Sequence, residues 1–382
     1  MRYKIFLEVS ALLILISPIL PIAFLNSQKS EEIYPEGFYV GLTADGDLVA
    51  TKFLIDKIKT FVNFIIINNP DLLRHETSIN EICDYAKDAG LNFFVHLKHP
   101  AWWEFNYNPH EWIESAKINY GQSFLGVYLF DEPGGNQLDR GEFRQFDESS
   151  KPPTYLYAAN TYVYYLYLQM RDFIKTDNLV TSDYGLFWFD YEAGYDSIFC
   201  EFGANRVTEL NIAACRGAAE MHNKTWGAMI TWSYNEPPYI ESPNEVYLDM
   251  IKAYHAGAKY ICIFNYPEIG PYGLLNQEYF DIIKQFKSYV SINSQNRTSN
   301  YDKIAYVLPE NYGWGMRGPS DNMWGVWEAD DLSPIIWNDL SGLIKKYGFD
   351  FDIVVQSPWL RVFANQHYDT LLFWDGRIQN PA

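Results

Sequence analysis

Apolar and polar positions alternate along most of this chain with two different periods. Short apolar runs predict buried strands, and apolar residues three and four apart predict amphipathic helices. The predicted strands cover residues 38–44, 60–68, 91–98, 124–130, 179–184, 197–201, 226–232 and 259–265. The predicted helices cover residues 47–59, 78–89, 110–119, 153–174, 206–222, 244–256 and 277–290. Eight strands that alternate with helices over about 250 residues predict a (β/α)8 TIM barrel.

The barrel pattern is weakest in its fifth unit, and a second pattern follows it. Between Gly185 and Asp196 the fifth helix is short or missing. The polar segment 291–300 is typical of a linker. Beyond it, residues 303–308, 351–355 and 370–374 predict strands, and residues 332–347 predict a helix. We therefore predict a barrel over 36–292 and a smaller flavodoxin-like α/β domain over 301–382, which is either complete or cut short.

The N-terminal segment predicts export. Arg2 and Lys4 precede an apolar run from Ile5 to Leu25, which is typical of a secretory signal peptide. The same run is long enough to span a bilayer, so an uncleaved membrane anchor over 1–25 is the alternative. Both interpretations predict an extracellular or cell-surface protein. The triplets that begin at Asn223 and Asn296 fit N-glycosylation of such a protein.

Composition narrows the possible partners. The formal charge of −19 disfavours nucleic-acid binding, which needs a basic surface. Aromatic residues make up 18% of the chain, and they fit either a Tyr-rich core or rings that stack on sugars. The four cysteines lack metal-ligand spacing. We expect them to be buried free thiols, with a disulfide between Cys200 and Cys215 as the alternative.

The fourth predicted strand ends in two acids and a proline. Leu125, Val127 and Leu129 occupy one face of this strand, and the opposite face ends in Glu132. Pro133 and the glycines after it stop the strand. TIM barrels place catalytic groups at the C-terminal ends of their strands. We therefore predict that Glu132 lies at the mouth of the barrel.

The same alternation places other polar residues at this mouth. Applied to the first, third, sixth and eighth strands, it leaves polar side chains facing the barrel axis where each strand ends. The residues expected to converge with Glu132 are Asp45, His96, Lys98, Glu201 and Tyr266. Asp131, Asp183, Tyr184 and Trp232 stand at other strand ends and are further candidates for substrate binding.

Two carboxyl groups across an aromatic-lined mouth suit the hydrolysis of glycosidic bonds. One carboxyl must carry a proton for the leaving oxygen, and the other must be ionised, as nucleophile or as base for water. We expect Glu132 to be the acid, since the apolar run before it raises its pKa by desolvation. Glu201 is the predicted second carboxyl, and Asp183 and Glu236 are its rivals.

The segment Asp131-Glu132-Pro133 resembles a motif of the TIM-barrel glycoside hydrolases in the clan that includes family 42 β-galactosidases and cellulases. That clan carries Asn-Glu-Pro or a similar motif after the fourth strand, which implies that Glu132 is the acid/base. Its nucleophile is a Glu that ends the seventh strand. Here this strand ends in 231–233, Thr-Trp-Ser, and Glu236 comes later. A barrel followed by a small α/β domain also resembles the family 42 layout.

Aromatic segments near the strand ends are candidate sugar-binding surfaces. Trp102 and Trp103 follow the third strand, Trp188 follows the fifth and Trp232 ends the seventh. The segment 312–327 predicts either a loop over the mouth, with Arg317 on the substrate hydroxyls, or an apolar seam between the two domains.

No metal or cofactor is expected. His96 and His99 are three apart and would face opposite sides of a strand, and P-loop or dinucleotide-binding glycine motifs are missing. The sequence thus predicts an exported glycoside hydrolase with a carbohydrate substrate. The alternative is an inactive barrel that binds carbohydrate at the cell surface.

Overall fold

The computed structural model of the chain describes residues 33–98, 103–142, 151–173, 178–203, 207–295 and 303–381. The predicted leader, the sequon at Asn296, His99 and Trp102 lie outside these ranges. Ile33–Ala382 form one compact unit. In the described part of the chain, no helix is long and apolar enough to cross a membrane.

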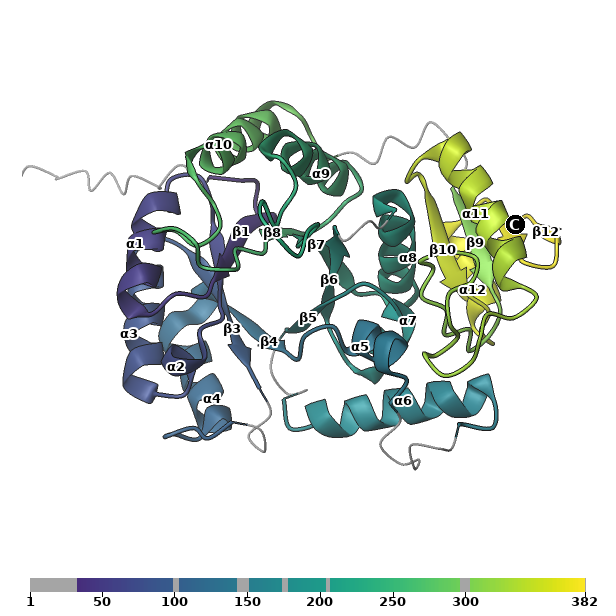
Figure 1. Cartoon of the computed structure of the whole chain (residues 1–382), viewed down its shortest axis with the longest axis horizontal. Coiled ribbons are helices and arrows are strands. Elements are labelled where there is room, and N and C mark those ends of the chain that lie inside the picture. Colours follow the sequence, from purple (N-terminus) through teal and green to yellow (C-terminus); the bar gives the residue numbers. More distant parts are fainter. Residues whose placement is uncertain are drawn as a thin grey trace, which may run out of the picture. The chain divides into compact units, whose positions relative to one another are not determined.

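Eight parallel strands close into a barrel, which confirms the predicted fold (Figure 1). They are β1 (Tyr39–Ala44), β2 (Phe64–Ile67), β3 (Asn92–Leu97), β4 (Phe124–Leu129), β5 (Leu179–Asp183), β6 (Ser197–Phe202), β7 (Thr225–Ile230) and β8 (Tyr260–Ile263). Each strand pairs with its neighbours in chain order, and β8 pairs with β1. The C-terminal ends of all eight strands therefore open at the same mouth.

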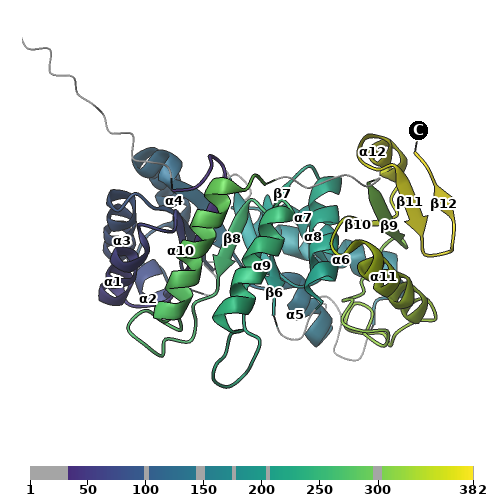
Figure 2. The same cartoon turned by 90° about the horizontal axis from the view of Figure 1, so that it is seen from above.

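Helices surround the strands, as expected for this fold (Figure 2). They are α1 (Leu48–Ile58), α2 (Pro70–Leu73), α3 (Glu76–Asp88), α4 (Pro109–Tyr120), α5 (Pro133–Arg140), α6 (Tyr155–Met170), α7 (Phe187–Ala193), α8 (Thr208–Met221), α9 (Pro243–His255) and α10 (Gln277–Ile292). The short α7 fills the doubtful fifth unit. The sequence pattern missed α2 and α5, because each is too short to show a helical period.

Two apolar layers hold the barrel together. One lies between the strands and the surrounding helices, and the other fills the interior of the barrel. The inner layer includes Phe64, Phe94, Phe199 and Tyr260, whose rings contact one another across the barrel. Leu125 packs against this inner layer, whereas Val127 and Leu129 belong to the outer one, so the prediction that all three share one face is wrong. The reason is an irregularity in the pairing of β3 with β4, where Gly126 has a φ of 134° and shifts the alternation by one residue.

A separate four-stranded sheet follows the barrel. Its elements are β9 (Ile304–Leu308), α11 (Ser333–Tyr347), β10 (Phe351–Val355), α12 (Leu360–His367), β11 (Thr370–Phe373) and β12 (Ile378–Gln379). The strand order is β10-β9-β11-β12, with β12 antiparallel to β11. The strands and the helix predicted here are present, and α12 and β12 are additions.

The C-terminal sheet packs against α8 of the barrel (Figure 1). Gly217 allows this approach, because a Cβ at this position would lie 2.1 Å from the carbonyl oxygen of Ile353. Beside it, the buried Arg216 forms an ion pair with Asp352, with 2.6 Å between Nε and Oδ1. The guanidinium also donates to the carbonyl oxygens of Phe349 and Phe351.

The segment 312–327 forms the apolar seam that was one of its two interpretations. Trp314 and Trp324 are fully buried. The ring of Trp324 contacts Tyr162 of α6 and Phe189 of α7, at centroid distances of 5.8 and 4.7 Å. The expectation of a loop over the barrel mouth is therefore wrong. All four cysteines are buried and free, so the alternative of a Cys200–Cys215 disulfide is not realised.

Candidate functional site

Glu132 owes its position to a turn rather than to strand alternation. β4 ends at Leu129, and both Phe130 and Glu132 are left-handed, with φ of 58° and 50°. Pro133 is then the first residue of α5, so it starts a helix instead of only stopping a strand. Left-handed backbone is uncommon for residues other than glycine, and its occurrence here is typical of a functional position.

Glu132 and Glu201 form a carboxyl pair at the mouth. Glu201 lies on β6 and is 5% exposed, whereas Glu132 is half-buried. Burial raises the pKa of Glu201 well above its usual range, and the nearby charges of Glu132 and Asp131 raise it further. A side-chain hydrogen bond to Glu132 acts in the same direction. Desolvation therefore favours the protonated form of Glu201 in this pair.

A hydroxyl network links this pair to Asp131. The hydroxyl of Ser182, on β5, lies 2.7 Å from Glu201 Oε1 and 3.2 Å from Asp131 Oδ1. The hydroxyl of Tyr128, on β4, lies 2.6 Å from the same Asp131 oxygen and 2.7 Å from Ser182 Oγ. These contacts fix both carboxyl groups in place.

A second polar chain crosses the ends of β1, β2 and β3. Asn68 donates from its amide nitrogen to Asp45, so its amide oxygen accepts a hydrogen bond from Nδ1 of His96. Burial lowers the pKa of His96 to about 4, so the ring is neutral at physiological pH. Nδ1 then carries the only ring proton, and Nε2 is a buried acceptor without a partner in the described chain. It can accept a hydrogen bond from a substrate hydroxyl.

Aromatic side chains lie at the mouth where β7 and β8 end. The rings of Trp232 and Tyr266 stack with centroids 5.6 Å apart and an interplanar angle of 12°. The indole N–H of Trp232 donates to the carbonyl oxygen of Tyr266 over 2.5 Å. Tyr266 is 42% exposed, so the pair presents a flat apolar face where β7 and β8 end. Such a face suits the apolar side of a sugar ring.

Lys98 and Asp45 are the other two charged candidates at the mouth of the barrel. Lys98 is half-buried, with its ammonium 5.4 Å from the ring centroid of Trp103, and its charge acts on His96. Burial raises the pKa of Asp45 to about 6, and the charge of Asp131 contributes to this shift. The side chains of Asp45, His96, Lys98, Asp131, Glu132 and Glu201 thus share one electrostatic environment.

Asp183 does not face the mouth, which corrects its proposed role as a rival carboxyl. It is fully buried and accepts four backbone N–H groups, from residues 134, 135, 184 and 185, over 2.5–3.1 Å. Two of these open α5, so Asp183 positions the turn that carries Glu132. Burial raises the pKa of its neighbour Asp190 to about 7, and the two buried carboxyls share a hydrogen bond.

Four other candidates have surroundings that differ from the predicted ones. Trp188 is 1% exposed in α7 and packs in the outer apolar layer, so it cannot stack on a sugar. Tyr184 is buried and donates to Asp139, the same carboxylate that pairs with Arg317. Arg317 also pairs with Asp321, so its guanidinium belongs to the seam. Glu236 is exposed on the loop after β7.

Three site residues escaped the sequence reasoning. Asn68 follows β2 directly, so the rule that selected Asp45 would have found it if that strand had been included. Ser182 and Tyr128 gave weaker signals, since a single hydroxyl on a buried strand is common. In the described ranges, no cluster of three His, Cys, Asp or Glu side chains could hold a metal ion.

Replacing Glu201 by Gln is expected to stabilise the fold at alkaline pH. The pKa of Glu201 is raised in the folded state, so the folded protein retains a proton that the unfolded chain releases above about pH 4.5. Stability therefore falls as pH rises from there toward the folded pKa, by about 1.4 kcal/mol per pH unit. A neutral amide removes this cost, and the gain should be absent at pH 4 and grow toward pH 8.

Thermal unfolding of both proteins between pH 4 and pH 8 measures this difference. Glu236→Gln is the matched control, because Glu236 is exposed, and it should follow the wild type at every pH. A Glu201→Gln protein that is less stable than the wild type at pH 8 would contradict the raised pKa. Comparing each variant with the wild type at the same pH removes the opposite contribution of the buried histidines.

Comparison with known proteins supports the fold. No protein-family model and no curated protein sequence matches the chain. Among solved structures, α-L-fucosidase isoenzyme 2 from Paenibacillus thiaminolyticus matches with a TM-score of 0.50 and 11% identity, over 84% of this chain and 58% of that one. The chain therefore spans less than two thirds of the length of this fucosidase.

Two further solved structures match with lower TM-scores. A family 5 glycoside hydrolase from Prevotella bryantii, solved with a xyloglucan tetradecasaccharide, has a TM-score of 0.39 and 11% identity over 66% of this chain and 96% of its own. An orotidine 5′-monophosphate decarboxylase from Methanocaldococcus jannaschii has a TM-score of 0.35 and 11% identity over 66% and 98%. At 11% identity, the likeness to the fucosidase shows the fold alone.

Proposed function

We propose that this protein is an exported glycoside hydrolase that uses Glu132 and Glu201 as its catalytic carboxyls. The observation that carries the proposal is their hydrogen-bonded contact at the barrel mouth, with one carboxyl desolvated and the other half-buried. Two acids whose environments separate their pKa values can act as proton donor and nucleophile in the same reaction. Export rests on the sequence of residues 1–25.

In this mechanism the two carboxyls exchange the roles expected from the sequence. Glu201, whose pKa burial raises, donates its proton to the leaving oxygen. Glu132, ionised and more accessible, attacks the anomeric carbon and forms a glycosyl ester as the leaving group departs. Glu201 then takes a proton from water, which attacks the same carbon and releases Glu132.

Contact between the carboxyls favours retention of anomeric configuration. An inverting enzyme holds its carboxyls about 6.5–9.5 Å apart to admit a water molecule, whereas a retaining enzyme holds them about 5–5.5 Å apart. Two carboxyls near enough to share a hydrogen bond fit the shorter of these separations better. The stacked Trp232 and Tyr266 would support the sugar ring, and the unpaired Nε2 of His96 would accept a hydrogen bond from one of its hydroxyls.

The test is hydrolysis of a panel of 4-nitrophenyl glycosides that covers both anomers of the common hexoses, pentoses and deoxyhexoses. Release of 4-nitrophenol from at least one glycoside is expected, with the first-formed sugar in the anomeric configuration of the substrate by proton NMR. Release with inversion would refute the two-step mechanism. If no glycoside is cleaved while sugars still bind, the protein is the carbohydrate-binding barrel.

A further inference from the structure

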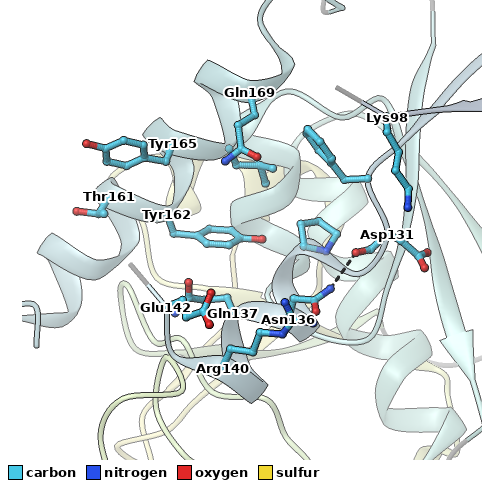
Figure 3. A pocket seen from close by; sticks show the side chains of 13 residues that line it. Lys98, Asp131, Asn136, Gln137, Arg140, Glu142, Thr161, Tyr162, Tyr165 and Gln169 are labelled. Atoms are coloured by element: carbon cyan, nitrogen blue, oxygen red, sulfur yellow. Dashed lines mark hydrogen bonds between the residues drawn. The ribbon is translucent and has the colours of Figure 1, made fainter. Parts of the chain in front are cut away.

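A cavity of about 430 Å³ lies between α5 and α6, beside the strand ends (Figure 3). Its inner end is formed by Lys98 after β3 and by Phe130 and Asp131 after β4. Its walls come from one face of α5 and one face of α6. The volume lies within the range of about 300–1,000 Å³ that is typical of ligand sites. The carboxyl pair does not line it.

The cavity shares a wall with the carboxyl pair. Asp131 lines the cavity, and its Oδ1 also accepts hydrogen bonds from Tyr128 and Ser182. Ser182 in turn contacts Glu201 over 2.7 Å. Two side chains, Asp131 and Ser182, therefore link the cavity to Glu201. A ligand that extends past Asp131 from Glu132 would enter the cavity directly.

The lining of the cavity is held by contacts behind it. The hydroxyl of Tyr162 donates to Asp190 over 2.5 Å, and Nε2 of Gln137 donates to the carbonyl oxygen of Trp324 over 3.0 Å. Asn136 donates to the carbonyl oxygen of Asp131 over 3.0 Å, as Figure 3 shows. Together with the contact between the rings of Tyr162 and Trp324, they fix α5 and α6 to the seam, so the cavity is preformed.

The side chains around the cavity match a neutral sugar. Aromatic rings of Phe130, Tyr162 and Tyr165 offer flat apolar faces, and amides on both helices offer paired donors and acceptors. Two cations, Lys98 and Arg140, are balanced by two acids, Asp131 and Glu142. A balanced lining in a chain with a formal charge of −19 gives no advantage to an anionic ligand.

We propose that this cavity is a subsite for a neutral sugar residue, adjacent along the glycan to the residue held at Glu132 and Glu201. The proposal rests on the proposed function and specifies its substrate class. The substrate is then a neutral oligosaccharide or polysaccharide, and recognition extends over at least two sugar residues. A terminal sugar on a small aglycone would leave the cavity unused.

Calorimetric binding separates this proposal from the catalytic one. The full chain with Glu201→Gln, which cannot protonate a leaving group, is titrated with cellotetraose, xylotetraose, mannotetraose, maltotetraose and β-1,4-galactotetraose. At least one should bind, and adding Tyr165→Ala or Arg140→Ala should weaken that binding about tenfold. Tyr167→Ala, on α6 but outside the cavity, is the matched control and should leave binding unchanged.

The outcomes are distinct for the two proposals. Binding that depends on Tyr165 and Arg140 supports the subsite even if the wild type hydrolyses none of these sugars, in which case only the catalytic proposal fails. Binding that neither substitution changes overturns the subsite. The subsite also fails if no tetrasaccharide binds. For a sugar that the wild type cleaves, the cavity variants should lose about tenfold in kcat/KM on the tetrasaccharide and less than twofold on the matching 4-nitrophenyl monoglycoside.

Discussion

Removing the carboxyl of Glu132 is expected to lower kcat/KM for glycoside hydrolysis by about 10⁴-fold, close to complete loss. The substitution to make is Glu132→Gly. Residue 132 has a φ of 50°, a conformation that glycine adopts without strain, so the variant should fold at least as well as the wild type. The loss would then report the missing nucleophile and not a damaged turn. Glu236→Gly, on an exposed loop, is the control for both stability and activity.

Azide distinguishes the role of Glu132 from that of Glu201. In Glu132→Gly, azide can occupy the space of the lost carboxylate and displace the leaving group directly, which gives a glycosyl azide of inverted configuration. In Glu201→Gly, Glu132 still forms the glycosyl ester, and azide displaces it to give a glycosyl azide of retained configuration. An activated 2,4-dinitrophenyl glycoside is needed in the second case, because its leaving group departs without a proton.

The opposite pattern of azide products would restore the assignment expected from the sequence, with Glu132 as the acid. The structure argues against it through the environments of the two residues. Glu201 accepts a hydrogen bond from Ser182 and is only 5% exposed, and this burial raises its pKa. Glu132 stands at the start of α5, where the helix dipole favours a negative charge.

The barrel and part of its mouth could be predicted from periodicity alone. A closed parallel barrel brings all C-terminal strand ends to one side, and a period of two decides which side chain faces the axis. These two rules placed Asp45, His96 and Glu201 correctly, because β1, β3 and β6 are regular up to their last residues. On each of these strands the apolar residues of the alternating pattern identify the outward face, so the residues between them could be assigned to the face toward the barrel axis.

Glu132 shows where this reasoning stops. The irregular pairing at Gly126 breaks the alternation inside β4, and the left-handed residues 130 and 132 break it again directly after the strand. Strand alternation therefore gave Glu132 the right location for a reason that does not hold in the structure. Ser182 was missed because β5, with polar residues at 181, 182 and 183, has no apolar alternation to divide its faces.

Trp188 illustrates a second limit of prediction from sequence: the local pattern does not show which distant segments pack against a residue. An aromatic run after a strand fits both a sugar platform and a packed helix, and the sequence does not show what covers it. Here the seam segment 312–327 lies against α7, since Trp324 contacts Phe189, so the run becomes core. Trp232, by contrast, is only half-buried where β7 ends, and its ring stacks with that of the exposed Tyr266.

Breaking the buried ion pair between α8 and β10 is the second change with a large expected effect. Asp352→Ala should lower the free energy of unfolding by about 3–5 kcal/mol. It leaves the guanidinium of Arg216 buried with only carbonyl oxygens as partners, and it removes the acceptor of the Tyr368 hydroxyl. The side chains of Arg216 and Asp352 are 3% and 1% exposed, so water cannot replace the lost charge.

Urea unfolding followed by tryptophan fluorescence measures this loss. Asp375→Ala removes the partner of Arg377 from an exposed ion pair of the same length, 2.6 Å, and should cost less than about 1 kcal/mol. The double variant Arg216→Met with Asp352→Leu should recover most of the loss, because apolar side chains need no charge compensation. If Asp352→Ala behaves like Asp375→Ala, the contact between α8 and β10 does not exclude water.

The same contact bears on the proposed catalytic site. Asn211 of α8 donates a hydrogen bond to the carbonyl oxygen of Glu201, so loosening α8 from β10 should lower the proposed glycosidase activity before the barrel unfolds.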